Sequence, residues 1–182
     1  MRKFLLALIL FSFSSVGYAV NCEVHKVYCK IVKLQPRIDK AKAMKLSNFI
    51  YKGAKAIGID PLISVAILNQ ENRFRNVHTY EVESSIKEEC HTSSCTRIVT
   101  EHQEVADMGI AQINIRTAIA YGFDLQRLYD HDIEYAIESH FIILKSKINM
   151  CKDLGNDSWS CYHSKTPEHR LKYVKMVSRY LK

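Results

Sequence analysis

The chain contains few of the residues that interrupt helices, with three prolines and six glycines among 182 residues. It also lacks internal repeats and low-complexity linkers, which argues against a repeat array or a string of tethered domains. The only long apolar run is Phe4–Phe13, about half of the roughly 20 residues that a membrane-spanning helix needs. These absences favour one helix-rich domain.

Residues 1–19 have the pattern of a secretory signal peptide. Arg2 and Lys3 give a positive start, the apolar run follows, and Gly17 and Ala19 place small residues where a signal peptidase reads. A membrane anchor is the alternative, but the apolar run is too short for it. We therefore expect cleavage after Ala19 and an exported protein, in the periplasm or outside the cell.

Residues 20–182 have the length of a single domain. The formal net charge is +7, of which Arg2 and Lys3 supply two. A basic exported protein attracts anionic partners, which include cell-wall polymers, lipid head groups and nucleic acid. Export and the lack of a basic-aromatic motif make nucleic acid the least expected of the three.

All six cysteines follow the expected cleavage point, and an even number in an exported chain indicates up to three disulfides. Six cysteines allow fifteen pairings. We expect pairs of near neighbours, because these close short loops. A zinc site at Cys90, His91 and Cys95 is the alternative, but the spacing fits no standard zinc pattern. The expected pairs are Cys90–Cys95, Cys151–Cys161 and Cys22–Cys29.

Helical patterns dominate the domain, with one segment of a different character. Residues 76–106 favour alternating and β-branched residues, which predicts a small β-hairpin or irregular lobe inserted between helices and overhanging a cleft. The result is an α+β fold that is mostly α. Helices are predicted, from apolar spacing and capping residues, over 36–57, 61–74, 115–120, 132–150, 159–163 and from 167 onward.

Four sequence pieces then stand out: ILNQENRF at 67–74, DMGIAQIN at 107–114, WSCYHS at 159–164 and HRLKYVKMV at 169–177. Together and in this order they resemble the superfamily of lytic transglycosylases and lysozymes. The resemblance covers 59–181 and is closest to the small transglycosylases that accompany secretion and conjugation machines. It implies a lysozyme-like fold.

Glu71 is the catalytic residue that the resemblance implies. It stands near the end of an apolar helix, where desolvation raises the pKa of a carboxyl and lets it act as an acid. Most lytic transglycosylases have serine next, where this chain has Asn72, which we expect to hydrogen-bond near the substrate. Asp107 occupies the position of the second catalytic carboxylate of animal-type lysozymes, and the alternative for it is a cap or turn before Gly109.

Further residues of the same pieces are expected to line the substrate cleft. Gly109 permits close approach of a sugar to the backbone. Gln112 and Asn114 offer amide groups, although local capping is an equal alternative for Asn114. Tyr162 is implied to face the acid and position the sugar, in a Tyr-His-Ser segment where the family usually has Tyr-Asn-Ala-Gly. Tyr173 is expected to pack in the core.

The resemblance implies cleavage of the β-1,4 bond between N-acetylmuramic acid and N-acetylglucosamine, with no metal or organic cofactor. The expected partners are peptidoglycan glycan strands and an envelope-spanning secretion or conjugation complex, with no nucleic acid and no membrane span after signal cleavage. Two alternatives remain: a true muramidase that hydrolyses the bond with Asp107, and a wall-binding scaffold without catalysis.

Overall fold

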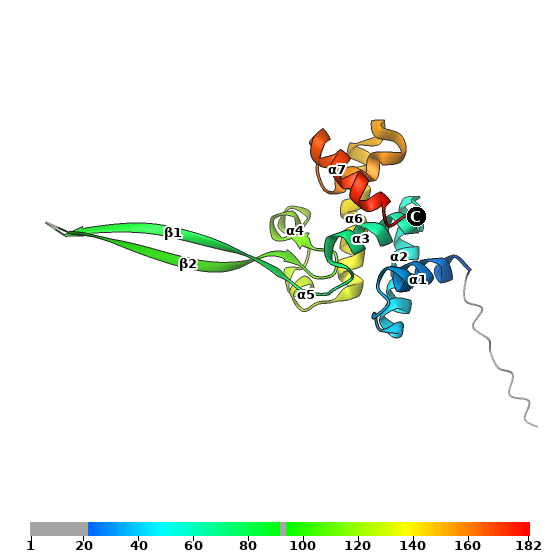
Figure 1. Cartoon of the computed structure of the whole chain (residues 1–182), viewed down its shortest axis with the longest axis horizontal. Coiled ribbons are helices and arrows are strands. Elements are labelled where there is room, and N and C mark those ends of the chain that lie inside the picture. Colours follow the sequence, from blue (N-terminus) through cyan, green and yellow to red (C-terminus); the bar gives the residue numbers. More distant parts are fainter. Residues whose placement is uncertain (1–21, 92–93) are drawn as a thin grey trace, which may run out of the picture.

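The computed structural model describes residues 22–91 and 94–182, and for residue 22 and residues 82–104 the backbone alone is described. The predicted signal peptide lies outside these residues. A body of helices carries a long two-stranded ribbon that projects from one side (Figure 1). The fold is α+β and mostly helical, as predicted. In chain order its elements are α1 Cys22–Leu34, α2 Lys40–Ile57, α3 Pro61–Asn72, β1 Thr79–His91, β2 Ser94–Met108, β3 Ile113–Asn114, α4 Ile115–Tyr121, α5 Leu125–Tyr129, α6 Ile133–Met150, the 3-10 helix η1 Lys152–Tyr162 and α7 Pro167–Ser178.

Helix α3 is the central element of the body and packs against α1, α2 and α7 (Figure 1). Its residues from Ser64 to Asn69 are buried on every side, which an apolar helix without a polar stripe requires. Val65, Ile67 and Leu68 are fully buried, and each such side chain stabilises the fold by about 1.5–3 kcal/mol. The last turn of this rigid helix carries Glu71.

Helix boundaries follow the capping residues that the sequence predicts. The Asp60 side chain accepts a hydrogen bond from the Leu62 N–H at the start of α3, and Asp132 caps α6 in the same way. Gly58 ends α2 at φ +74°, a left-handed conformation that glycine adopts without steric cost. The first predicted helix is shorter than the expected 36–57: it begins at residue 40, because Asp39 caps it.

Helix α1 was not predicted, and it overturns one expected disulfide. Val24, Val27 and Ile31 are buried along one face of α1. Cys22 and Cys29 lie on this same helix, where a step of seven residues spans about 10.5 Å. Because a disulfide needs Cα atoms closer than about 7 Å, the pair Cys22–Cys29 is wrong. Cys29 is free and exposed, with its Sγ 3.3 Å from His25 Nε2.

The other two cysteine pairs have different outcomes. Cys151 and Cys161 form the expected disulfide, with Cα atoms 6.4 Å apart. This bridge ties the end of α6 to η1. Cys90 and Cys95 stand opposite each other in the backbone register of β1 and β2, but their side chains lie outside the described ones, so this pair stays a prediction.

The β-ribbon occupies nearly the same residues as the expected lobe but points in another direction. Strands β1 and β2 have 13 and 15 residues and pair antiparallel, with a register shift between Thr79 and Tyr80 at the base. The short β3 adds to β2 beside Asp107. The ribbon extends away from the helical body instead of folding over it (Figure 1). The expectation that it overhangs the cleft is therefore wrong, and only its base lies near the predicted site residues.

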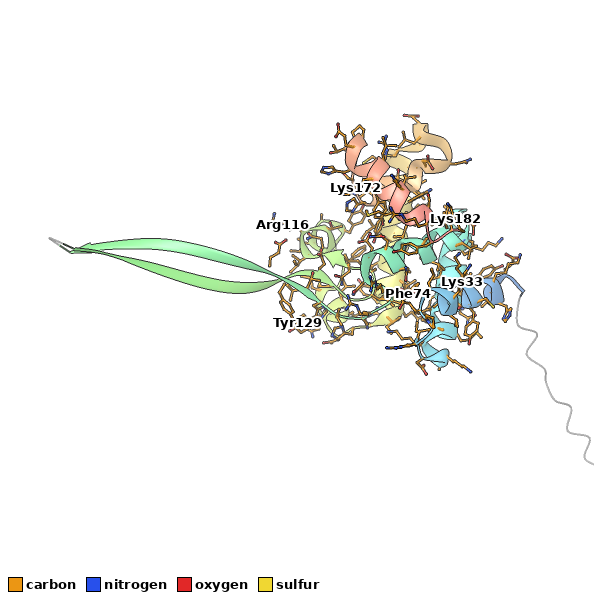
Figure 2. The ribbon with its side chains drawn as sticks, in the orientation of Figure 1. Lys33, Phe74, Arg116, Tyr129, Lys172 and Lys182 are labelled. Atoms are coloured by element: carbon orange, nitrogen blue, oxygen red, sulfur yellow. A yellow bond between two sulfur atoms is a disulfide. The ribbon has the colours of Figure 1, made fainter. Side chains whose placement is uncertain are left out.

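The helices of the body bury a continuous apolar core (Figure 2). None of the described helices has the length and apolar character needed to cross a lipid bilayer.

Candidate functional site

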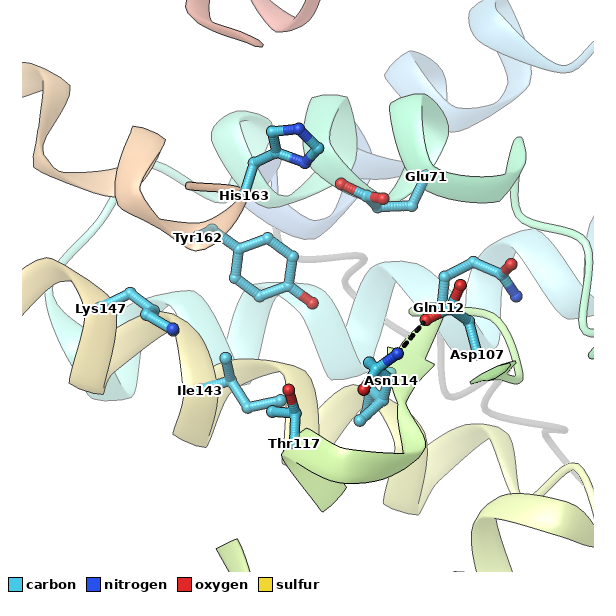
Figure 3. Close-up of a pocket in the computed structure, with 10 residues that line it drawn as sticks. Glu71, Asp107, Gln112, Asn114, Thr117, Ile143, Lys147, Tyr162 and His163 are labelled. Atoms are coloured by element: carbon cyan, nitrogen blue, oxygen red, sulfur yellow. Dashed lines mark hydrogen bonds between the residues drawn. The ribbon is translucent and has the colours of Figure 1, made fainter. Parts of the chain in front are cut away.

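A cavity of about 420 Å³ brings five of the predicted site residues together (Figure 3). Its volume is within the range of about 300–1,000 Å³ that small-molecule sites occupy. Its wall combines the end of α3, the base of β2, the segment through β3 into α4, the second half of α6 and the end of η1. The lining residues are Glu71, Asp107, Gln112, Ile113, Asn114, Thr117, Ile143, Lys147, Tyr162 and His163.

Glu71 is a mostly enclosed carboxyl with one strong hydrogen-bond partner. The hydroxyl of Tyr173 donates to Glu71 Oε1 over 2.5 Å. Burial raises the pKa of Glu71, the Tyr173 hydrogen bond opposes this effect, and the charge of Asp107 adds to it, with a raised pKa as the result. Desolvation disfavours the ionised form of an acid, so this carboxyl keeps its proton to higher pH than an ordinary glutamate.

Tyr173 on α7 is the residue whose role the sequence analysis missed. It is 1 % exposed, and its ring stacks on His163 with centroids 4.6 Å apart. Burial raises the pKa of Tyr173 well above its ordinary value, and the Glu71 charge adds to this, so the phenol stays a donor. Tyr173 therefore does pack in the core, as expected, but it also holds the Glu71 carboxyl in place.

Asp107 faces the same cavity from the base of the ribbon. Its Oδ2 accepts a hydrogen bond from Thr79 Oγ1 and its Oδ1 accepts one from Asn114 Nδ2, each over 3.2 Å. Thr79 and Asp107 are also register partners of β1 and β2. Both carboxylate oxygens thus have fixed partners, which orients the group toward the cavity that it shares with Glu71 (Figure 3).

Asn114 lines the cavity, but its polar atoms serve the fold. Its side-chain oxygen accepts from the Arg116 N–H and caps α4, while its amide nitrogen donates to Asp107 and to the Ala106 carbonyl. The capping alternative is therefore confirmed for this residue. Its connection to the site is the position that it gives Asp107.

Gln112 and Gly109 belong to one tight turn between β2 and β3. Gln112 has φ +47°, and its amide nitrogen donates to the carbonyls of Val77 and Gly109 over 2.9 and 2.8 Å. These bonds leave the side-chain oxygen of Gln112 as the group that can meet a ligand. Gly109 has φ +67° and faces Asn76 and Ala136, so it is not among the residues that line the cavity. The turn conformation by itself accounts for glycine here, and the expected approach of a sugar to Gly109 stays a prediction.

Asn72 also lies away from the cavity, and its expected substrate contact is wrong. Its side chain is 4 % exposed and donates to the Arg75 carbonyl over 2.8 Å. The turn that it holds contains two consecutive residues in the left-handed region, Arg73 at φ +50° and Phe74 at φ +57°. Lys42 adds a hydrogen bond to the Phe74 carbonyl. The strained turn directly after Glu71 thus depends on Asn72, which explains an amide at this position.

Tyr162 enters the cavity between its two ends, with its hydroxyl directed toward the middle (Figure 3). His140, fully buried on α6, stands behind it with Nδ1 3.0 Å from the Tyr162 hydroxyl oxygen. Burial lowers the pKa of His140 to about 3, so the imidazole is neutral. Burial also raises the pKa of Tyr162, as do the charges of Glu71 and Asp107, so this phenol stays protonated.

The hydrogen bond between His140 and Tyr162 has a preferred direction. His140 Nε2 is buried and has no hydrogen-bond partner. A neutral imidazole has one N–H, and a buried N–H without a partner is rarer than an unpaired acceptor. This favours Nδ1 as the donor to the tyrosine oxygen, and the phenolic hydrogen of Tyr162 then points to the cavity. No sequence pattern indicated this pair, because His140 is a lone histidine on a buried helix face.

The site is thus a cavity lined by a carboxyl with a raised pKa, a second oriented carboxyl and the phenol of Tyr162, while the phenol of Tyr173 bonds to the first carboxyl from the core. Such an arrangement can donate a proton to a bound ligand and stabilise developing positive charge. Across the parts of the chain that the structure describes, no three histidine, cysteine or acidic side chains gather to hold a metal ion. No known protein-family model, curated protein or solved structure matches this chain.

Proposed function

We propose that this protein cleaves the β-1,4 bond between N-acetylmuramic acid and N-acetylglucosamine in peptidoglycan, as a lytic transglycosylase. The observation that carries the proposal is the Glu71 carboxyl, with its raised pKa, its Tyr173 hydrogen bond and its access to a cavity. Protonating a glycosidic oxygen requires an acid that still holds its proton near the working pH. The raised pKa of Glu71 favours the protonated form that this role needs.

The proposed reaction uses Glu71 twice. Glu71 first donates its proton to the bridging oxygen while the bond from that oxygen to C1 of the muramyl residue breaks. The 6-hydroxyl of the same muramyl residue then bonds to C1 and gives its proton to the Glu71 carboxylate. The products are a 1,6-anhydro-muramyl end and a free 4-hydroxyl, with no water consumed. The hydroxyl of Tyr162 and the side-chain oxygen of Gln112 orient the sugar.

A lysozyme-like fold is part of the same proposal. The order of elements supports it: a buried helix ends in the acid, an antiparallel ribbon follows, and the second carboxylate stands where the ribbon returns to the body. The helices after the ribbon then close the opposite wall and supply Tyr162 and Tyr173.

Asp107 favours a second candidate, a true muramidase. It lines the same cavity as Glu71, and its charge contributes to the raised pKa of Glu71. In a retaining glycosidase, a second carboxylate acts as the nucleophile or stabilises the charge that develops at C1, and water completes the reaction. The two candidates differ in product: an anhydro end for the transglycosylase and a reducing end for the muramidase.

The test is mass spectrometry of the fragments that purified peptidoglycan releases. Glu71→Gln removes the acid and keeps the shape, and Glu138→Gln is the matched control, because Glu138 is exposed on α6 and does not line the cavity. We expect anhydro-ended fragments from the wild type and from Glu138→Gln, and none from Glu71→Gln. Reducing-ended fragments that Asp107→Asn abolishes would replace the transglycosylase with a muramidase.

A wall-binding protein without catalysis is the outcome that would overturn both candidates. It predicts that the wild type releases no fragments from acetylated or deacetylated wall and that Glu71→Gln binds the wall equally well. Our proposal extends to export and to local opening of the wall for an envelope-spanning complex. Its support for that part is the resemblance to secretion-associated transglycosylases and the basic charge of the chain.

A further inference from the structure

The cavity has charges of opposite sign at its two ends (Figure 3). Glu71 and Asp107 stand toward one end, beside Gln112. Lys147, one helical turn after Ile143 on α6, stands at the other end, beyond Tyr162. A ligand that fills the cavity therefore meets carboxyl groups at one end and an ammonium group at the other.

Lys147 is half-buried in the wall of the cavity. It makes no side-chain hydrogen bond or ion pair with any residue whose side chain the structure describes. An ammonium carries three donors, and partial burial removes some of the water that would satisfy them. Thr117 on α4 lines the same cavity between Asn114 and Lys147, and its hydroxyl points toward Tyr162 (Figure 3). Both groups are available to a ligand.

We propose that Lys147 and Thr117 form a subsite for a carboxylate on the muramyl side of the glycan strand. This proposal rests on the function proposed above. The muramyl residue is the sugar of peptidoglycan that carries a lactyl group. Its carboxyl is free when the peptide stem has been removed, and an intact stem supplies carboxylates of its own. A lysine binds either as a point charge, and the threonine adds one directional hydrogen bond.

The subsite also sets the direction in which the strand lies. The charge of Asp107, and that of Glu71 when it ionises, repel a substrate carboxylate from their end, whereas Lys147 attracts it to the other. The muramyl residue then lies on the Lys147 side of the scissile bond, and the N-acetylglucosamine that leaves lies on the Asp107 side.

The test compares Lys147→Met with the matched control Lys145→Met. Methionine keeps an unbranched side chain of similar length without the charge, and Lys145 is exposed on the same helix and does not line this cavity. The substrates are soluble glycan chains with peptide stems, chains stripped of stems by an amidase, and both kinds with their carboxylates converted to amides. KM and kcat are measured for each, together with Lys147→Arg as the conservative variant.

We expect Lys147→Met to raise KM about tenfold on chains that carry the recognised carboxylate, with kcat changed little, because one hydrogen bond to a charged group is lost. Amidated chains should show no difference between the variants. Lys147→Arg should restore most of the loss, and added salt should reduce the wild-type advantage. An effect on stripped chains alone identifies the lactyl carboxylate, and an effect on stem-bearing chains alone identifies the stem.

An equal rise in KM of Lys147→Met on charged and amidated chains would overturn the subsite, because Lys147 would then only shape the wall of the cavity. So would the absence of any effect. Binding of the same chains to Glu71→Gln, with and without Lys147→Met, separates this result from a failure of the proposed function. Suppose that the wild type shows no cleavage, and that charged chains bind about tenfold more weakly to the Lys147→Met protein than to the protein with Lys147. The subsite then stands and the catalytic proposal fails.

Discussion

Removing the Tyr173 hydroxyl should make the Glu71 carboxyl hold its proton more tightly. The hydroxyl donates to Glu71 Oε1 over 2.5 Å, and this bond lowers a pKa that burial and Asp107 raise. A hydrogen bond to a charged group contributes about 1.5–3 kcal/mol, against about 0.5–1.5 kcal/mol to a neutral one. The Tyr173→Phe variant therefore loses about 1–1.5 kcal/mol more from the ionised form, which corresponds to roughly a tenfold higher proton affinity.

Phenylalanine keeps the ring that stacks on His163, so the variant should fold. The titration is followed by NMR of ¹³C-labelled glutamate carboxyls, with Glu71 identified by its loss in Glu71→Gln. The midpoint should move to higher pH in Tyr173→Phe, and the alkaline limb of kcat/KM should move with it. Tyr180→Phe is the control, because Tyr180 is a partly buried tyrosine that packs against the core, whereas the hydroxyl that donates to Glu71 is that of Tyr173. A midpoint that stays or falls would refute the assignment of Tyr173 as the donor.

The remaining predictions concern stability. Folding raises the pKa of Glu71, so protonated Glu71 stabilises the folded protein. This contribution is fully present below the pKa that Glu71 has in the unfolded chain, and it is lost as pH rises through the pKa of Glu71 in the folded protein. Glu71→Gln should therefore be about 1 kcal/mol more stable than the wild type at pH 8 but not at pH 4, as measured by urea unfolding, and an equal difference at both pH values would contradict this. Replacing Cys151 and Cys161 by alanine removes a link with a sequence separation of 10, which should cost about 2.7 kcal/mol and lower kcat/KM by displacing Tyr162. Unchanged activity in a folded double variant would show that the bridge does not position that tyrosine.

The parts of the fold that depend on local chemistry were predictable from sequence. Asp60 with Pro61 at the start of α3, Gly58 at the end of α2 and Asn114 at the start of α4 act within a few residues of themselves, so sequence spacing locates them. The direction of the ribbon was not predictable, because its alternating residues specify pairing between β1 and β2 and not the angle at the base.

The candidate site divides in the same way. The order of the motifs predicted that Glu71 and Asp107 line one cleft, and both line the same cavity. The partners of these groups depend on how whole helices rotate against each other, which the sequence pattern does not encode. Tyr173 was therefore expected only to pack in the core and His140 was not singled out, although each holds a group that faces the cavity. Asn72 shows the opposite error. It was expected to contact substrate because it follows Glu71, but its side chain holds the turn after α3.

The bond between Tyr173 and Glu71 joins residues 102 positions apart, and this has a consequence for the order in which the protein assembles. Helix α7 follows every other described element in the chain. During synthesis from the N-terminus, α3 can form before α7 has been made. The acid is therefore present early but gains its hydrogen-bond partner only when the last helix docks, so a partly emerged chain carries the carboxyl without the environment that tunes it.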